Sequence, residues 1–284
     1  VALAGLENGV VDEHSSTFCP GFYRLPGSEH KYRCWRKGGH GTVSLKFAIA
    51  QSCDVYFYDL ARSLGIDRLH DYLAQFGFGG RTGIDLVGER GGILPSSAWK
   101  RAARKEPWYP GETLISGIGQ GYNLTTPVQL AAATATLASY GEFRPPHLVH
   151  AVRDPAGNLA PMTIPPSRVI PIVNRANWED TLAAMVEVVH GERGTAKKIG
   201  LGIDYQIGGK TGTAQVFGLK QDEKYDAKKI DKRLHDLALF IAFAPADAPR
   251  IAVAVVVENG GSGSGVAAPI ARIILDQYFK DNPL

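Results

Sequence analysis

The sequence predicts an α+β fold in which an antiparallel sheet, built from the last third of the chain, is flanked by helices on both faces. Two strongly apolar runs, 237–244 and 251–257, are typical of buried strands. The link between them is short enough to make the pair an antiparallel hairpin. The segment 205–216 mixes β-branched residues with glycines and predicts a further strand, one that lets a ligand approach the backbone closely.

Apolar residues at helical spacing predict the helices around this sheet. The expected helices are 1–10, two pieces within 44–65, 67–76, 127–140, 178–190 and 266–279. Asp54 is expected to cap the second piece of 44–65, and Thr126 with Pro127 to begin the helix 127–140. The other segments are expected to be irregular, namely 11–43, 81–95 and 104–111, apart from a small hairpin region within 143–172 that turns at 154–157.

Composition narrows the class of protein. The 284 residues are 44% hydrophobic and 21% charged, which is ordinary for a globular protein. A net charge of +3 without a basic run gives no support for nucleic-acid binding. No apolar stretch reaches the length of a membrane span, and no signal peptide is visible. We therefore expect 1–284 to be one domain of a longer protein, with its first part missing and no membrane anchor of its own.

The stretch Lys210, Thr211, Gly212 and Thr213 is the first candidate site, and it lies inside the predicted strand 205–216. Lys210 supplies a positive charge, the two threonines supply hydroxyls, and the Thr213 backbone supplies an N–H. Together these groups suit a carboxylate and a developing oxyanion. Since Lys-Thr-Gly is common, the plain alternative is a sheet strand followed by a turn.

Context favours the catalytic interpretation. Lys-Thr-Gly belongs to a motif set that also contains Ser-x-x-Lys and a Ser-x-Asn element. A variant of the last, Ser52-Cys53-Asp54, lies far upstream of Lys210.

Several further stretches make the chain resemble the class B penicillin-binding proteins, and among them the penicillin-binding protein 2 branch of the elongation machinery. Ile118-Gly119-Gln120-Gly121-Tyr122-Asn123 looks like the family's Gly-Gln-Gly stretch. Gly194-Thr195-Ala196 and the Lys-Thr-Gly segment follow in the family's order, and Ser-x-Asp in place of Ser-x-Asn is the variant of that branch. The resemblance extends over nearly the whole chain and implies the transpeptidase fold shared with serine β-lactamases.

The resemblance also implies an activity. Family members are peptidoglycan D,D-transpeptidases, in which a serine attacks the D-Ala-D-Ala bond of a stem peptide and an amine resolves the acyl-enzyme; β-lactams acylate the same serine. Carried over by position, Ser52 takes part in proton relay and Asp54 hydrogen-bonds the substrate amide and the active-site lysine. Lys210, Thr211, Gly212 and Thr213 hold the terminal carboxylate, and the Thr213 N–H is half of the oxyanion hole.

The implied setting is the periplasmic face of the bacterial inner membrane. There the expected partners are a SEDS-family (RodA-like) glycosyltransferase and other elongation-complex proteins. The anchor and a pedestal domain are expected outside this chain.

The family's nucleophile is the point of departure. Its serine and lysine, three residues apart on one helix face, would fall just before Val1, so we expect 1–284 to lack the Ser-x-x-Lys element and the first strands of the sheet. The chain's own Ser-x-x-Lys match is Ser97 to Lys100, which follows Pro95 in what we expect to be a polar loop. Without a buried helix this match is a weak candidate for the nucleophile.

Cys19, Cys34, His40 and Cys53 lie within 35 residues of one another and suggest a structural zinc site. Three thiolates and an imidazole suit a closed tetrahedral site, which would hold the irregular segment and the loop that presents Ser52. Some members of the resembled branch carry a metal at a matching place. A Cys19–Cys34 disulfide and three free thiols remain open as alternatives, and His14 and His30 are alternative fourth ligands.

Two other functions stay open on the same fold. One is a non-catalytic module that senses β-lactams or binds a partner, and the other is a serine β-lactamase, for which no Glu-x-x-x-Asn loop stands out. The charged segment 218–235 next to the Lys-Thr-Gly strand is either a solvated loop or a lid over the donor peptide.

Overall fold

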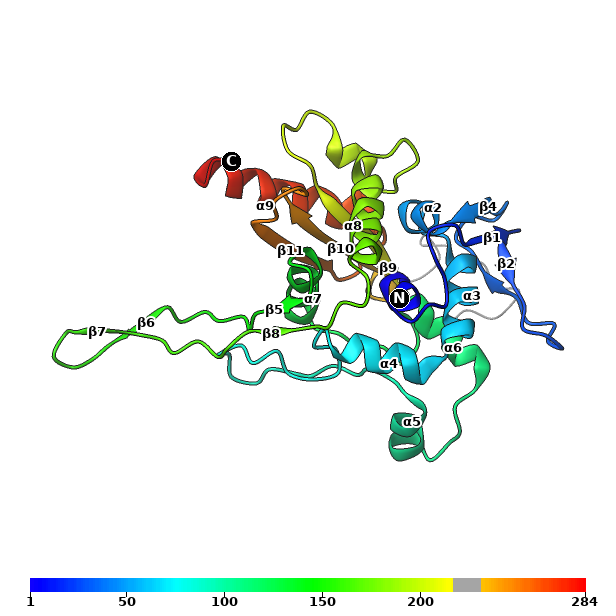
Figure 1. Cartoon of the computed structure of the whole chain (residues 1–284), viewed down its shortest axis with the longest axis horizontal. Helices are drawn as coiled ribbons and strands as arrows, with labels where there is room; N and C mark the ends of the chain where they lie inside the picture. The colour runs from blue at the N-terminus through cyan, green and yellow to red at the C-terminus, as the bar shows by residue number, and fades with distance from the viewer. Residues whose placement is uncertain (217–230) are drawn as a thin grey trace.

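The computed structural model of the protein describes residues 1–216 and 231–284. The predicted α+β class is confirmed within these ranges. Three antiparallel strands form the central sheet in the order β11-β10-β9 (Figure 1). They are β9 (Gly208–Ala214), β10 (Leu237–Ala244) and β11 (Ile251–Val257). The two apolar runs therefore pair as the predicted hairpin, and the segment with Lys-Thr-Gly adds the third strand.

Helices are the most common regular element in the rest of the described chain. The α-helices are α1 (Ala2–Glu7), α2 (Leu45–Ala50), α3 (Asp54–Leu64), α4 (Ile66–Ala74), α5 (Ser97–Arg104), α6 (Pro110–Gly117), α7 (Pro127–Ala138), α8 (Arg175–His190) and α9 (Ala268–Asp281). Short turns of other helix types are η1 (Lys197–Gly200), η2 (Lys232–Leu234) and η3 (Gly263–Ala267). None of the helices in the described ranges combines the length and apolar character needed to cross a membrane.

Helices cover both faces of the sheet, as predicted. Because side chains alternate along a strand, Phe240 and Ile241 of β10 point to opposite faces. Phe240 is fully buried in a core that includes Leu275 of α9. Ile241 lines a cavity together with Leu137 of α7 and Met185 of α8. The face that carries Lys210, which pairs with Ile241, therefore looks toward α7 and α8.

The segment 11–43 is more ordered than predicted. It contains four short strands, β1 (Ser16–Cys19), β2 (Phe22–Tyr23), β3 (Tyr32–Arg33) and β4 (Gly41–Ser44). They form two antiparallel pairs, β1 with β4 and β2 with β3. These strands are two to four residues long, too short to show an apolar period in the sequence.

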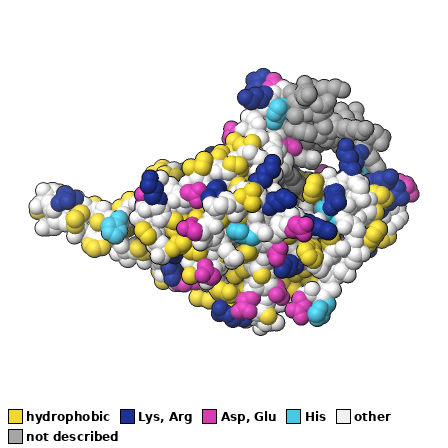
Figure 2. Space-filling view, turned by 90° about the horizontal axis from the view of Figure 1, so that it is seen from above, with side chains coloured by type: hydrophobic (Ala, Val, Ile, Leu, Met, Phe, Trp, Pro, Cys, Tyr) yellow, Lys and Arg dark blue, Asp and Glu magenta, His cyan; other side chains and the backbone are white. Residues whose placement is uncertain are grey.

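A long arm leaves the body between α7 and α8 (Figures 1 and 2). Its base is the pair β5 (Glu142–Phe143) and β8 (Arg168–Val169), and its tip is the hairpin β6 (Ala151–Arg153) and β7 (Leu159–Pro161). The tip turns at 154–157, where the Gly157 N–H donates to the Asp154 carbonyl at 2.9 Å. The predicted hairpin region is confirmed.

Two local predictions were wrong. Asp54 does not cap a helix: it is the first residue of α3, and its carboxylate accepts from the Trp35 N–H. The stretch from Ser97 to Lys100 is not a loop but the start of α5, because the Ser96 hydroxyl caps that helix by accepting from the Trp99 N–H. Most of the charged segment predicted at 218–235 falls in 217–230, outside the described residues. Its last residues, 231–235, are described and include η2.

Candidate functional site

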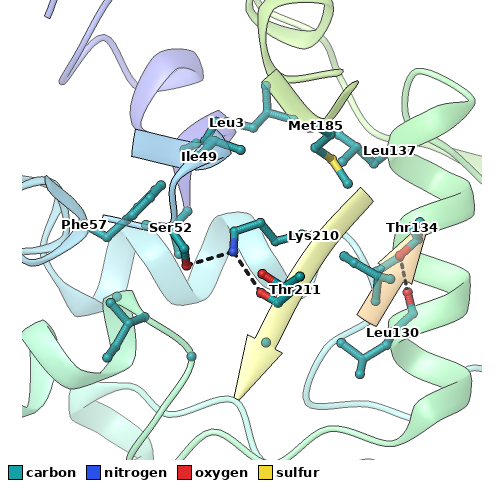
Figure 3. A pocket seen from close by; sticks show the side chains of 18 of the residues that line it. Leu3, Ile49, Ser52, Phe57, Leu130, Thr134, Leu137, Met185, Lys210 and Thr211 are labelled. Atoms are coloured by element: carbon teal, nitrogen blue, oxygen red, sulfur yellow. Dashed lines mark hydrogen bonds between the residues drawn. The ribbon is translucent and has the colours of Figure 1, made fainter. Parts of the chain in front are cut away.

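Lys210 lies in β9, the strand at one edge of the described sheet. Its Nζ donates to the Ser52 hydroxyl at 2.9 Å and to the Thr211 carbonyl at 2.8 Å (Figure 3). Burial lowers the pKa of Lys210 to about 8, while the Asp54 carboxylate acts in the opposite direction. The structure thus brings together two motifs that are 158 residues apart in sequence.

Ser52 lies on the short link between α2 and α3, and Asp54 is the first residue of α3. Ser52 has φ +55°, a left-handed backbone conformation that is uncommon for a residue with a Cβ atom. Asp54 accepts a hydrogen bond from the Trp35 N–H at 2.8 Å. Burial is the main cause that raises the pKa of Asp54 to about 7, and the nearby Cys34 thiol group adds to it. Both predicted residues line the same cavity as Lys210.

The Gly-Gln-Gly stretch contacts β9 near the C-terminal end of that strand. Gln120 donates from Nε2 to the Thr213 carbonyl at 3.0 Å. Because the N–H and C=O of one strand residue point to the same side, this contact places the Thr213 N–H on the outer edge of β9, away from β10. That is the orientation the oxyanion-hole prediction requires. Gly119 and Gly121, with φ of +75° and +73°, make the tight turn that brings Gln120 there.

Thr195 is a site residue for which the sequence analysis predicted no role. It follows α8, and its hydroxyl lies 2.9 Å from the Thr211 hydroxyl. Its N–H donates to the Ala50 carbonyl at 3.2 Å, which ties the segment after α8 to the end of α2. The only sequence signal for Thr195 is its place in Gly194-Thr195-Ala196.

These residues surround one cavity of about 870 Å³. Its polar wall is formed by Ser52, Asp54, Gln120, Thr195 and the segment 210–213. The opposite wall is apolar and includes Leu137 and Met185 (Figure 3). A cavity with few convergent polar groups, one buried cation and an apolar wall suits a small acidic ligand with an uncharged body.

The weak Ser-x-x-Lys candidate is held elsewhere. Neither Ser97 nor Lys100 is among the described residues that line the cavity. The Lys100 side chain is 1% exposed and forms ion pairs with Glu106 and Glu112. Its Nζ also lies 4.3 Å from the ring centre of Tyr109. Lys100 therefore ties α5 to α6 and is not available as a catalytic base.

The predicted metal ligands converge. One donor atom from each of Cys19, Cys34, His40 and Cys53 lies within 4.8 Å of the other three. His40 Nδ1 is 3.6 Å from Cys19 Sγ and 3.5 Å from Cys34 Sγ. The three cysteines are buried and unpaired. These four donor atoms are close enough together to hold one metal ion, and thiolates with an imidazole are a common ligand set of structural zinc sites.

The local backbone explains why His40 is the fourth member. Gly39 has φ +74°, and a Cβ there would lie 2.1 Å from the Cys19 carbonyl oxygen, so only glycine allows this close turn. The alternative ligands His14 and His30 are exposed and outside the cluster. His40 Nε2 is buried without a hydrogen-bond partner in the described structure.

Comparison with known proteins gives consistent matches. The penicillin binding protein transpeptidase domain family matches residues 1–276. Peptidoglycan D,D-transpeptidase MrdA of Escherichia coli is 42% identical over 282 residues, which are 99% of this chain and 44% of that protein. The MrdA of Haemophilus influenzae is 41% identical over 283 residues, 99% of this chain and 43% of that protein. The chain therefore spans less than half the length of these curated relatives.

Solved structures agree. Pseudomonas aeruginosa PBP2 in complex with WCK 5153 superimposes with a TM-score of 0.86 at 48% identity, covering 98% of this chain and 58% of that one. PBP2 of Helicobacter pylori, in a complex with MreC, superimposes with a TM-score of 0.81 at 32% identity, covering 97% of this chain and 47% of that one.

Proposed function

The chain belongs to the penicillin-binding protein transpeptidase domain family, and from that premise we propose that it is the D,D-transpeptidase domain of a larger cell-wall enzyme that β-lactams inhibit. The observation that carries the proposal is the convergence of Lys210, Ser52 and the Thr213 edge on one cavity. A cation next to outward backbone N–H groups is what a terminal carboxylate and a neighbouring oxyanion require.

The proposed reaction has two steps. A serine hydroxyl attacks the carbonyl of the penultimate D-Ala; the ester bond forms, the amide bond breaks, and D-Ala leaves with the proton. An amine of a second stem peptide then attacks the ester, an amide bond forms, and the serine regains its proton. The Thr213 N–H stabilises the oxyanion in both steps, a donor worth about 10²-fold in rate.

We assign a separate role in this reaction to each side chain around the reacting bond. Lys210 holds the terminal carboxylate of the donor peptide, and Ser52, hydrogen-bonded to Lys210, relays protons to and from the leaving group. Asp54 accepts from the substrate amide. The described cavity serines are Ser52, Ser262 and Ser264, and none of them is followed by a lysine three residues later. We therefore assign the attacking serine to a Ser-x-x-Lys element outside residues 1–284.

Intact-mass spectrometry with and without a penicillin tests the proposal. The full-length protein is expected to gain one penicilloyl group, and residues 1–284 alone are expected to gain none. Incubation with a D-Ala-D-Ala stem peptide and an amine acceptor should release D-Ala and form the cross-linked product. Penicillin labelling without any D-Ala release would instead favour the non-catalytic sensing module, and no labelling of the full-length protein would overturn the proposal.

We also propose that Cys19, Cys34, His40 and Cys53 hold one structural zinc ion. The support is the chemistry of the donor set and its burial: three thiols and an imidazole that face one point. The ion would bind the paired strands of 11–43 to the loop that carries Ser52, because Cys53 is the middle residue of Ser-x-Asp.

Elemental analysis of wild type and two histidine variants tests this site. About one zinc per chain is expected in wild type and in His30→Ala, because His30 is exposed and outside the cluster. His40→Ala is expected to lose zinc and to unfold at a lower temperature, since binding of a structural metal contributes to folding free energy. Metal-free wild type of full stability would contradict the proposal.

The setting follows from the substrate. Peptidoglycan stem peptides lie outside the inner membrane, so we propose a periplasmic location and a role next to an elongation-complex glycosyltransferase of the SEDS (RodA-like) type. The H. pylori relative supports an elongation partner, since its structure is a complex with MreC. Co-purification of such proteins with the full-length enzyme from cross-linked cells tests the partners, and their absence would argue against them.

A further inference from the structure

Trp35 is an exposed aromatic residue in an unusual position. Its side chain is 61% exposed, although it belongs to the segment that carries the cysteine cluster. It lines the cavity next to Ser52 and Asp54. A side chain this exposed buries little apolar surface, so its structural contribution comes mainly from its hydrogen bonds.

The hydrogen bonds of Trp35 go to residues 51, 52 and 54, at and next to the Ser-x-Asp element. The indole Nε1–H donates to the Ser52 carbonyl at 2.8 Å and to the Gln51 carbonyl at 3.0 Å. The main-chain N–H of Trp35 donates to the Asp54 carboxylate at 2.8 Å. Trp35 therefore contacts both sides of Cys53: the Ser52 backbone before it and the Asp54 side chain after it.

The Ser52 backbone is where such support matters. Ser52 is one of few non-glycine residues of the described chain with positive φ, and a left-handed conformation persists only where its surroundings hold it. In this conformation its hydroxyl meets Lys210 Nζ at 2.9 Å. Hydrogen bonds to the carbonyls of residues 51 and 52 fix the two peptide groups that flank Ser52.

We propose that Trp35 is a positioning residue for the acylation reaction: its indole N–H holds the strained Ser52 backbone, which aims the Ser52 hydroxyl at Lys210. The inference rests on the proposed function. Trp35 acts through Ser52 and takes no part in bond making itself. Its ring edge also meets His40 at a centroid distance of 5.5 Å, so the same side chain links the cysteine cluster to the catalytic loop.

The test replaces Trp35 by Phe in the full-length protein that contains this chain. Phenylalanine keeps an aromatic ring and loses the N–H, while the main-chain bond to Asp54 remains. Stopped-flow labelling with a fluorescent penicillin separates the acylation rate constant k2 from the dissociation constant K. We expect k2 to fall about 10- to 100-fold, as when a reacting group is misplaced. K should stay within about twofold of wild type.

The controls separate positioning from folding. Trp99→Phe, in α5 and away from the cavity, should leave k2 unchanged. Zinc content of Trp35→Phe should match wild type, and its melting temperature should fall only slightly, because the lost hydrogen bonds lie at an exposed side chain. If Trp35→Phe unfolds, Trp35→Tyr, which also lacks the indole N–H, carries the test.

The outcomes discriminate. An unchanged k2 overturns the inference, and an increase in K at unchanged k2 also does, since it would make Trp35 a wall for substrate. Absence of penicillin labelling in wild type is a failure of the proposed function and not of Trp35.

Discussion

The left-handed backbone of Ser52 predicts that glycine at this position is more stable than alanine, the reverse of the order found in a helix. Ser52→Gly and Ser52→Ala both remove the hydroxyl that accepts from Lys210, so they lose the same hydrogen bond. They differ in the Cβ atom at φ +55°. A left-handed conformation costs an L-residue about 1–2 kcal/mol. Glycine loses about 0.5–1 kcal/mol more backbone entropy on folding. The difference leaves Ser52→Gly more stable than Ser52→Ala by about 0.5–1 kcal/mol.

Ser63 provides the matched control. It is an exposed serine inside α3, where the backbone is helical. There the order reverses, and Ser63→Ala should be more stable than Ser63→Gly by about 1 kcal/mol. Urea denaturation of the four variants at constant m-value gives both differences.

Penicillin labelling completes the experiment. Both Ser52 variants are expected to be labelled slowly and to similar extents, because each lacks the hydroxyl. A Ser52→Gly protein that is equal to or less stable than Ser52→Ala would refute the argument that the site stores backbone strain. Fast labelling of either variant would refute the proton-relay role.

Three further perturbations test the site and its supports. Because Lys210 must be charged to hold a carboxylate and its pKa lies at about 8, the penicillin dissociation constant K should rise as pH increases above that value, by about tenfold per unit; a flat profile to high pH would contradict this. Gly117→Ala puts a Cβ 2.3 Å from the Ala61 Cβ and should destabilise the protein to urea by about 1–3 kcal/mol. A stability gain would mean that the α3–α6 contact is loose. Lys100→Met breaks the ion pair with Glu112 and should lower the melting temperature without slowing penicillin labelling of the folded protein; slower labelling at unchanged stability would revive Lys100 as a catalytic residue.

The sequence was most informative where a motif has its own local chemistry. Lys210 and Thr213 were identified from a strand pattern with a cation and hydroxyls, and the metal candidates from three thiols and a histidine. The structure brings Lys210 to Ser52 and the three thiols to His40. Both predictions used residue type, which can be read without knowing the fold. The match from Ser97 to Lys100 was a weak candidate because it rested on spacing alone. The structure agrees, since two acidic side chains pair with Lys100 away from the cavity.

Local pattern also explains the errors in the first 43 residues. Strands of two to four residues cannot show a period, and their pairing depends on partners up to 28 positions away, such as Ser16 and Ser44. Asp54 looked like a helix cap because aspartate often is one. Its real partner, the Trp35 N–H, comes from a segment that the helix pattern does not include.

By itself the sequence determined the α+β class, the strand that carries Lys-Thr-Gly and the Ser-x-Asp element, and it identified three cysteines and a histidine as candidate metal ligands. Only the tertiary structure decided that Lys210 donates to Ser52, that Gln120 donates to the Thr213 carbonyl, and that the Trp35 indole donates to the Ser52 carbonyl. The physical reason is range: periodicity and motif chemistry act over a few residues, whereas these contacts join segments 17 to 158 residues apart, which are brought together by packing of the sheet, α3 and α8.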